Sequence, residues 1–294
     1  KLHHEYEILG NLQIDGVVKA LALEKVNNSV MIVMQEKHAI SLKQWMNQNH
    51  KKGVTDVKIC LEYFIRFCEV LAEVHKKGIF HRDIKPDNII VEPTSGKIFL
   101  INFGKAVNSF DDALALEDGM SFGGSLAYIS PEQTGRMNRV EDYRTDLYSA
   151  GVTFYELFSH HLPFEAEDSM GWVHCHIAKT PPMATQKNPD VPNVVSQIFH
   201  RLLAKNAEDR YQTVYGLKKD LEKCLEQWDS SNCILPFALG EFDKRTEFKI
   251  SQKLYGRDKD IDVLAGIYKK VSLGAKELVV ICGPSGIGKS SLAS

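Results

Sequence analysis

Residues 81–88 read His-Arg-Asp-Ile-Lys-Pro-Asp-Asn, and residues 102–104, which begin fourteen positions after Asn88, read Asn-Phe-Gly. Phosphoryl transfer needs a hydroxyl held in line, a group that accepts its proton and charges that neutralise the phosphate. The first run offers these parts. We expect Asp83 to accept the hydroxyl proton and Lys85 to lie against the transferring phosphate. Asn88 would offer an amide oxygen to a magnesium ion.

These motifs give the chain from Glu5 to about Trp228 a resemblance to the eukaryotic-type serine/threonine protein kinase family. A lysine between Asp83 and Asn88 is the serine/threonine form of that family's catalytic loop. The resemblance implies an α+β, protein-kinase-like fold, with a truncated small N-terminal lobe and a mainly helical C-terminal lobe. It also implies ATP and Mg²⁺ as cofactors and a protein as substrate.

Other positions match residues that support the site in this family. The resemblance implies that Asp146 braces the backbone of the catalytic loop and that Glu132 pairs with Arg210. Glu5 resembles the helix glutamate that pairs with a strand lysine beside the nucleotide. We expect His81 to be structural and Arg82 to be a partner for a phosphate on the activation segment.

Two serines are candidates on the activation segment. Ser125 resembles the residue that helps to hold Asp83 and Lys85 when this segment is ordered. Ser121 and Ser125 are both candidate phosphate acceptors or positioning hydroxyls, and the sequence leaves open which one has which role.

The chain departs from the family pattern in two ways. No Gly-rich phosphate loop and no strand lysine precede Glu5, so we expect those parts to lie before Lys1. Asn102 replaces the aspartate that holds magnesium, so both predicted metal ligands, Asn88 and Asn102, are neutral amides. A carboxylate near a divalent ion is worth on the order of several kcal/mol. We therefore predict catalysis at least ~100-fold weaker than with a carboxylate at position 102.

An alternative is that another acid supplies the missing charge, and Glu117 and Asp118 are the candidates. The activity of the fragment itself is therefore open. Asn102 favours a second interpretation, in which the domain is a pseudokinase that scaffolds or gates an attached ATPase.

A second nucleotide motif lies at residues 283–290, which read Gly-Pro-Ser-Gly-Ile-Gly-Lys-Ser after a strand-like run at Leu278–Cys282. This pattern is typical of a P-loop, whose backbone amides cradle phosphates while its lysine reaches the outer phosphates and its serine binds magnesium. The predicted binding residues are Gly283, Gly286, Gly288, Lys289 and Ser290. The alternative is a Gly-rich turn with an incidental lysine. We do not expect this fragment to hydrolyse nucleotide at this motif.

The resemblance is closer to one subgroup of the family. Residues 122–139 and the Leu-Tyr-Gly-Arg at 254–257 resemble signalling proteins that join a kinase domain to a P-loop (STAND/AAA-like) ATPase, often followed by sensor and histidine-kinase domains. The expected domains are a kinase domain at 1–228, a connector at 229–256 and the truncated start of an α/β NTPase domain at 257–294. The other domains of the parent chain would be its partners.

Hydrophobic periodicity predicts the main elements. We expect a helix at 4–9, a hairpin of strands 17–23 and 30–34, a helix that begins at Thr55 or Asp56 and ends at Gly78, strands at 89–92 and 97–101, a buried helix at 147–158, and amphipathic helices over 195–203 and 217–228.

Composition excludes several classes of partner. The 294 residues carry a formal charge of −2, which gives no reason to expect nucleic acid as a partner.

Six cysteines without paired spacing fit a reducing, cytoplasmic compartment. No apolar run approaches the roughly 20 residues that span a bilayer. His174-Cys175-His176 lacks a second ligand cluster, so we expect packing at a helix surface rather than a metal site.

Overall fold

The computed structural model describes residues 2–27, 29–49, 56–108, 126–137, 139, 141–244, 258–272, 274 and 276–283. The chain divides into two compact units, one of residues 1–136 and 140–248 and the other of residues 137–139 and 249–294.

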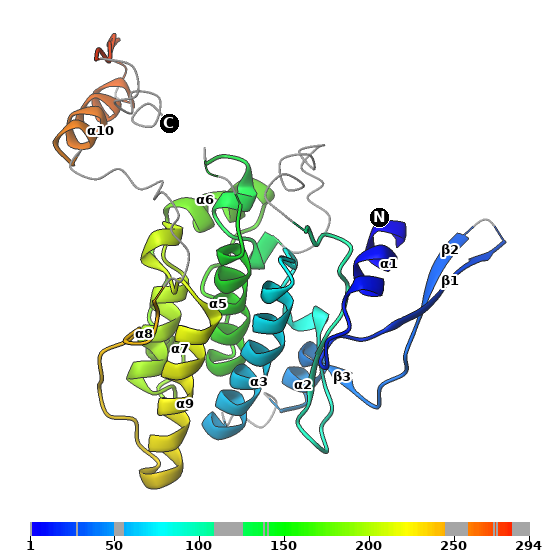
Figure 1. Cartoon of the computed structure of the whole chain (residues 1–294). Coiled ribbons are helices and arrows are strands. Elements are labelled where there is room, and N and C mark those ends of the chain that lie inside the picture. The colour runs from blue at the N-terminus through cyan, green and yellow to red at the C-terminus, as the bar shows by residue number, and fades with distance from the viewer. Residues whose placement is uncertain are drawn as a thin grey trace. The chain divides into compact units, whose positions relative to one another are not determined.

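The first unit begins with α1 (Leu2–Asn11) and a hairpin of β1 (Ala20–Val26) and β2 (Ser29–Met34). The two strands pair antiparallel, with Val26 opposite Ser29, so the predicted hairpin is present. Its first strand, predicted at 17–23, lies three residues later, because the pairing with β2 continues to Val26. Both strands pack against α1, and the hairpin extends away from the helices (Figure 1). No residue of either strand is buried.

A three-stranded antiparallel sheet positions the end of the motif at residues 81–88 and the start of the motif at residues 102–104. Its strands are β3 (Ile40–Ser41), β4 (Ile89–Val91) and β5 (Ile98–Leu100), in the order β3-β4-β5. Ile89 is opposite Leu100, so the residue before β4 and the residues after β5 lie at the same end of this strand pair. The backbone N–H of Ile101 donates to the carbonyl of Asn88 at 3.1 Å. The pairing therefore brings Asn88 and Asn102 together, and both predicted strands are confirmed.

Most of the first unit is a helical body, of which two helices precede β4 in the chain and the others follow β5 (Figure 1). Its α-helices are α2 (Leu42–Asn49), α3 (Val57–Lys76), α5 (Arg144–Ser159), α6 (Ser169–Ala178), α7 (Ala184–Lys187), α8 (Asn193–Leu202) and α9 (Val214–Ser231). Its short 3-10 turns are η2 (Pro86–Asn88), η3 (Leu126–Tyr128), η4 (Glu132–Thr134) and η5 (Ala207–Asp209).

Helix α3 begins and ends where its sequence predicts. The Asp56 carboxylate accepts a hydrogen bond from the backbone N–H of Ile59 at 3.1 Å, so Asp56 is the N-cap. Lys77 is the C-cap, and Gly78 follows with a φ of 74°, which glycine adopts without steric cost. The apolar stripe packs against α5 and α9.

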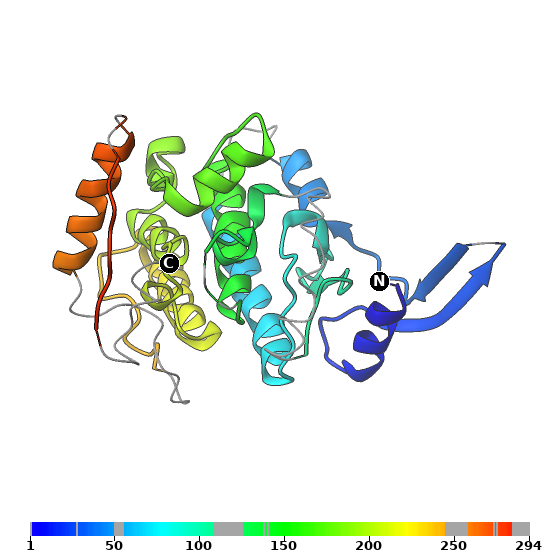
Figure 2. The same cartoon turned by 90° about the horizontal axis from the view of Figure 1, so that it is seen from above.

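Helix α5 lies in the middle of this body (Figure 2). All of its residues are buried, as its predominantly apolar sequence predicts. Phe154 stacks on Phe64 of α3 with ring centroids 3.8 Å apart. At Gly151 the neighbouring helix α8 is so close that an added Cβ would lie 2.7 Å from Leu202 Cβ. The sequence thus sets a rigid central helix against which the site is built.

The chain after α9 lies against the helical body. The Asp243 side chain has no exposed surface and accepts hydrogen bonds from the backbone N–H groups of Gln212 and Thr213, both at 2.8 Å. Arg201 Nη2 lies 3.0 Å from the same carboxylate. A Cβ at Gly216 would lie 2.5 Å from Asp243, so the close approach requires glycine. The described part of the expected connector therefore packs on α8 and α9.

The second unit contains α10 (Asp258–Ser272), a helix that the sequence argument does not predict. The strand predicted at Leu278–Cys282 is not found, since residues 276–283 carry no strand. A strand is defined by its hydrogen bonds to a neighbour, and none of the described strand pairings includes this run. Within the described part of the chain, no helix has the length and apolar character that a bilayer crossing needs.

Candidate active site

The catalytic loop predicted at residues 81–88 is held from beneath by Asp146 of α5. The buried Asp146 carboxylate accepts hydrogen bonds from the backbone N–H groups of His81 and Arg82, both at 2.8 Å. His75 Nε2 lies 2.9 Å from the same carboxylate. Burial alone would raise the pKa of Asp146, but the contacts with His75 and His81 outweigh it and hold the pKa below its ordinary value. The carboxylate therefore stays charged beneath the loop.

These hydrogen bonds offset a strained backbone. Arg82 has a φ of 61°, in the left-handed region, which costs a non-glycine residue roughly 1–2 kcal/mol. The Asp146 carboxylate fixes the N–H groups of the two successive peptides that lead into this residue. The contacts of Asp146 are those that the resemblance implies for a residue that braces this loop.

His81 connects the loop to the segment that contains Asn102. Its side chain is buried, its Nε2–H donates to the Ile101 carbonyl at 3.0 Å and its Nδ1 accepts from the Asp83 N–H at 3.3 Å. Burial lowers the pKa of His81. The ring is therefore neutral and carries its proton on Nε2, which agrees with the structural role expected for it.

Asp83, Lys85, Asn88 and Asn102 form one hydrogen-bonded cluster. Lys85 Nζ lies 3.1 Å from Asp83 Oδ2. Asn88 Nδ2 donates to the same oxygen at 2.9 Å and to the Asp83 carbonyl at 2.7 Å. Asn102 Nδ2 donates to Asn88 Oδ1 at 3.1 Å. The structure thus brings together the four side chains that the two motifs predict for the reaction.

A fifth side chain, Lys105, belongs to this cluster. Its Nζ donates to Asp83 Oδ1 at 3.0 Å, so each carboxylate oxygen of Asp83 contacts one ammonium group. Burial raises the pKa of Asp83, but Lys105 and then Lys85 outweigh burial and hold that pKa below its ordinary value. The motifs do not predict a role for Lys105. The one signal in the sequence is that it immediately follows Asn-Phe-Gly.

The ion pair expected between Glu132 and Arg210 is present. Both side chains are buried, and Arg210 donates from Nη1 to Glu132 Oε1 at 2.7 Å and from Nη2 to Oε2 at 2.8 Å. Thr145 Oγ1 donates to Oε1 at 2.9 Å. Such a two-point contact fixes the end of the activation segment to the helical body.

Arg82 contacts an acid rather than a phosphate within the described residues. Its Nε donates to Glu141 Oε2 at 2.7 Å, and both side chains are about four-fifths buried, with exposed fractions of 17% and 21%. Burial raises the pKa of Glu141 more than Arg82 lowers it. The phosphate partner expected for Arg82 stays a prediction.

Glu5 is buried on α1, with 8% of its surface exposed. This helix contacts the segment that follows Asn102, because His4 Nε2 donates to the Ala106 carbonyl at 2.7 Å. The helix that contains Glu5 is therefore beside the segment that begins with the predicted metal ligand Asn102. Its role there stays a prediction.

Several predicted residues lie outside the described part of the chain. They are Ser121 and Ser125, the alternative acids Glu117 and Asp118, and the P-loop residues Gly286, Gly288, Lys289 and Ser290. Gly283 is described and exposed. The P-loop and the two serines therefore stay predictions.

The tripeptide His174-Cys175-His176 packs as expected. Cys175 and His176 are fully buried, and His176 Nε2 donates to the Leu126 carbonyl at 2.8 Å. Among the residues that the structure describes, no three His, Cys, Asp or Glu side chains are grouped to hold a metal ion.

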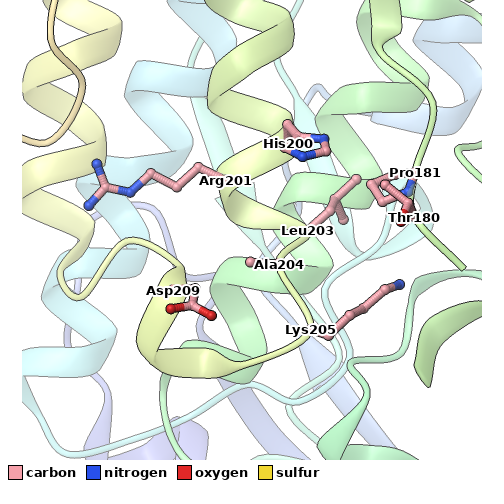
Figure 3. Close-up of a pocket in the computed structure, with 8 residues that line it drawn as sticks. All are labelled: Thr180, Pro181, His200, Arg201, Leu203, Ala204, Lys205 and Asp209. Atoms are coloured by element: carbon pink, nitrogen blue, oxygen red, sulfur yellow. The ribbon is translucent and has the colours of Figure 1, made fainter. Parts of the chain in front are cut away.

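A cavity of about 360 Å³ lies elsewhere, between the turn before α7 and the end of α8 (Figure 3). Its two long cations point in opposite directions: Arg201 contacts Asp243, and Lys205 donates to the Cys175 carbonyl at 3.1 Å. No residue predicted for the site lines this cavity. It lacks the converging polar groups that a ligand site needs.

A family model described as the protein kinase domain matches residues 1–221. This chain belongs to the protein kinase domain family. By family the domain is therefore a kinase enzyme, and protein kinases in general use ATP and Mg²⁺.

Three relatives show the range of proteins that contain such a domain. Hybrid signal transduction histidine kinase G of Dictyostelium discoideum is 31% identical over 81% of this chain and 9% of its own length. Serine/threonine-protein kinase pkn3 of Myxococcus xanthus is 35% identical over 52% of this chain and 29% of its own. Peroxide stress-activated histidine kinase mak3 of Schizosaccharomyces pombe is 27% identical over 70% of this chain and 9% of its own. The kinase domain thus spans less than a third of each relative.

The residues of this kinase domain do not fit the magnesium ion that its family implies. Magnesium prefers carboxylates and keeps several waters. Here both predicted ligands are amides, and the NH₂ group of Asn102 donates to the Asn88 oxygen that would face the metal. The carboxylate of Asp83 is already engaged by two ammonium groups. A cation at Asn88 Oδ1 would have to displace the Asn102 contact and would lie near two ammonium groups.

Proposed function

We propose that this chain contains an ATP-dependent serine/threonine protein kinase domain of a multi-domain signalling protein, and that Asn102 weakens its phosphotransfer. The observation that carries the proposal is the hydrogen-bonded cluster of Asp83, Lys85, Asn88 and Asn102. The Asp146 carboxylate fixes the backbone of the loop that contains Asp83. The family assignment of residues 1–221 supports the proposal independently.

In the proposed reaction, a serine or threonine hydroxyl of the protein substrate donates its proton to the Asp83 carboxylate. The hydroxyl oxygen forms a bond to the terminal phosphorus of ATP, and the bond from that phosphorus to the bridging oxygen breaks, so ADP leaves. The Lys85 ammonium, held 3.1 Å from Asp83, balances the negative charge on the transferring group. Asn88 orients Asp83 through one hydrogen bond to its carboxylate and one to its backbone carbonyl.

The expected weakness follows from the amide at position 102. An aspartate there would add a negative charge beside Asn88, where a divalent ion needs one. We expect Asn102→Asp in the full-length protein to raise phosphotransfer at least ~100-fold, because each ~1.4 kcal/mol of restored transition-state stabilisation is a factor of ten. The measurement is transfer of labelled γ-phosphate to the protein itself and to a general serine/threonine protein substrate.

Asp83→Asn is the companion variant, because it keeps the shape of the side chain and removes the charge. It should abolish transfer in both the natural and the Asn102→Asp background. Unchanged transfer in Asn102→Asp would refute the weakening, and transfer that persists in Asp83→Asn would refute the assigned base. Circular dichroism of each variant checks that the fold is kept.

The proposed multi-domain context rests on two observations. Residues 283–290 have the P-loop pattern, and two relatives carry histidine kinase in their names and are about ten times longer than the part that matches. We propose that an ATPase and sensor domains of the same parent chain are the partners of this domain.

A second function, a regulatory pseudokinase that controls the attached ATPase, is favoured by Asn102 together with the Lys105 contact on Asp83. It predicts nucleotide binding without turnover. It also predicts that Asn102→Asp leaves phosphotransfer at background while a change in the cleft alters the ATPase rate of the full-length protein.

A further inference from the structure

The cluster of side chains around Asp83 has an unusual charge balance for a site that handles phosphates; we call the proposed nucleotide site at this cluster the cleft. The cluster holds one carboxylate, two ammonium groups and two neutral amides, contributed by Asp83, Lys85, Lys105, Asn88 and Asn102. Its net charge is therefore positive before any cation binds. A divalent cation is repelled by such a cluster, whereas a polyphosphate is attracted by it.

The orientation of the two amides is fixed by the hydrogen bonds around them. Asn88 Nδ2 donates to two oxygens of Asp83, so Asn88 Oδ1 must face the other way, toward Asn102. Asn102 must then present its NH₂ group to that oxygen, at 3.1 Å. The amides are thus arranged as donors along the chain Asn102–Asn88–Asp83. A cation at Asn88 Oδ1 would break this chain.

Lys105 is placed to act on a phosphate. Its side chain is 40% exposed, whereas the Asp83 side chain that it contacts is only 10% exposed. The ammonium is therefore held at the mouth of the cluster and not inside it. A lysine stem is flexible and its ammonium behaves as a point charge, so it can move from a carboxylate to a phosphate oxygen nearby.

We infer that this cleft binds the polyphosphate of a nucleotide without a divalent cation, and that the Lys105 ammonium is the counter-charge that replaces the metal. The inference rests on the proposed function only in taking the same cleft as the nucleotide site. A phosphate that draws Lys105 away from Asp83 Oδ1 leaves that oxygen open to a substrate hydroxyl. Nucleotide binding and exposure of the carboxylate are then one event.

The test is ATP binding to the full-length protein, measured by calorimetry in excess chelator and in excess Mg²⁺. Lys289→Ala in every variant removes the lysine of the second nucleotide motif, and the part of the heat that changes with Lys105 reports this site. The natural cleft should bind ATP with affinities that agree within a few-fold in the two conditions. Lys105→Met, which keeps the length of the side chain and removes its charge, should weaken binding in chelator at least ~10-fold.

Two variants control this measurement. Lys105→Arg keeps the charge and should retain most of the affinity in chelator. Lys58→Met removes an exposed lysine at the start of α3 that pairs with Asp229. It should leave ATP binding unchanged. The double change Asn102→Asp with Lys105→Met should make binding depend on Mg²⁺.

The outcomes separate this inference from the proposed function. Binding by the natural cleft only with Mg²⁺ overturns the inference and leaves the kinase assignment intact. Equal affinities of Lys105→Met and the natural protein in chelator overturn the role of Lys105. Absence of ATP binding in both conditions sinks the inference together with the proposed nucleotide site.

Discussion

Both side chains of the ion pair between Glu132 and Arg210 are buried, with exposed fractions of 6% and 0%. Removing one partner of such a pair leaves an uncompensated buried charge. We predict that Arg210→Met lowers the free energy of unfolding by about 3–5 kcal/mol. Urea denaturation measures this loss.

The matched control for that variant is an exposed pair. Lys58 and Asp229 contact each other at 2.6 Å with about half of each side chain exposed, so Lys58→Ala should lower the free energy of unfolding far less than Arg210→Met. Adding Glu132→Gln to Arg210→Met should recover part of the loss, because no charge then remains buried. A loss of under 1 kcal/mol in Arg210→Met alone would contradict the prediction.

The buried ring of His176 predicts a dependence of stability on pH. Burial lowers its pKa from 6.5 to about 4. Between these values the unfolded chain takes up a proton that the folded chain does not, so the free energy of unfolding falls as the pH falls. The loss reaches at most about 3 kcal/mol near pH 4.

His176→Asn should remove this part of the pH dependence, and urea denaturation at several pH values across that window measures it. Asp146 does not interfere, because its pKa is below the ordinary 3.8 and its contribution is lost only at lower pH. Parallel stability curves for the natural protein and His176→Asn above pH 4 would show that the ring is not the source.

The sequence predicts the site well where the signal is local. Asp83, Lys85 and Asn88 lie within six residues, and β4 and β5 carry the pairing that adds Asn102. Lys105 escapes prediction because its partner is 22 residues away and a lysine has many possible partners. The Arg82–Glu141 contact escapes for the same reason, since 59 residues separate the two.

At the scale of elements, Asp243 fixes the segment after α9 to the start of that helix. Its carboxylate satisfies the N–H groups of Gln212 and Thr213, pairs with Arg201 and has no exposed surface. We predict that Asp243→Ala lowers the free energy of unfolding by about 2–4 kcal/mol, because two partly buried N–H donors and one guanidinium lose their acceptor.

Thermal and urea denaturation of Asp243→Ala test this prediction, with Glu241→Ala as the control at an exposed position two residues away. The control should change stability by about 0.5 kcal/mol or less. Equal effects of the two variants would mean that this segment does not stabilise the helical body.

The elements differ in how far the sequence predicts them, for a physical reason. Long helices with a clear stripe, such as α3, have caps and periodicity that act locally. The two-residue strand β3 depends on its partner β4, and the run at 278–282 is apolar enough for a strand but has no pairing partner among the described strands. Apolar character alone does not make a strand, because a ladder needs two chains.

At the scale of the whole molecule, the first unit extends over residues that were expected to be connector. Residues 229–231 belong to α9, and residues up to 244 contact the helical body through Asp243. The second unit is described over α10 and residues 276–283. The boundary predicted after Trp228 and the start of an NTPase domain at 257 stay predictions.

The fully buried helix α5 has a consequence for how the site opens. The amides of His81 and Arg82 bond to Asp146, and every neighbour of Asp146 along α5 is buried as well, so no local fraying can release them. We predict that these two amide protons exchange with deuterium only through global unfolding, at the free energy measured by urea. Amides of the exposed hairpin, for example that of Glu24, should exchange far sooner. Faster exchange at 81 and 82 would mean that the loop separates from Asp146 while the domain stays folded. If exchange needs global unfolding, the catalytic geometry lasts as long as the folded domain.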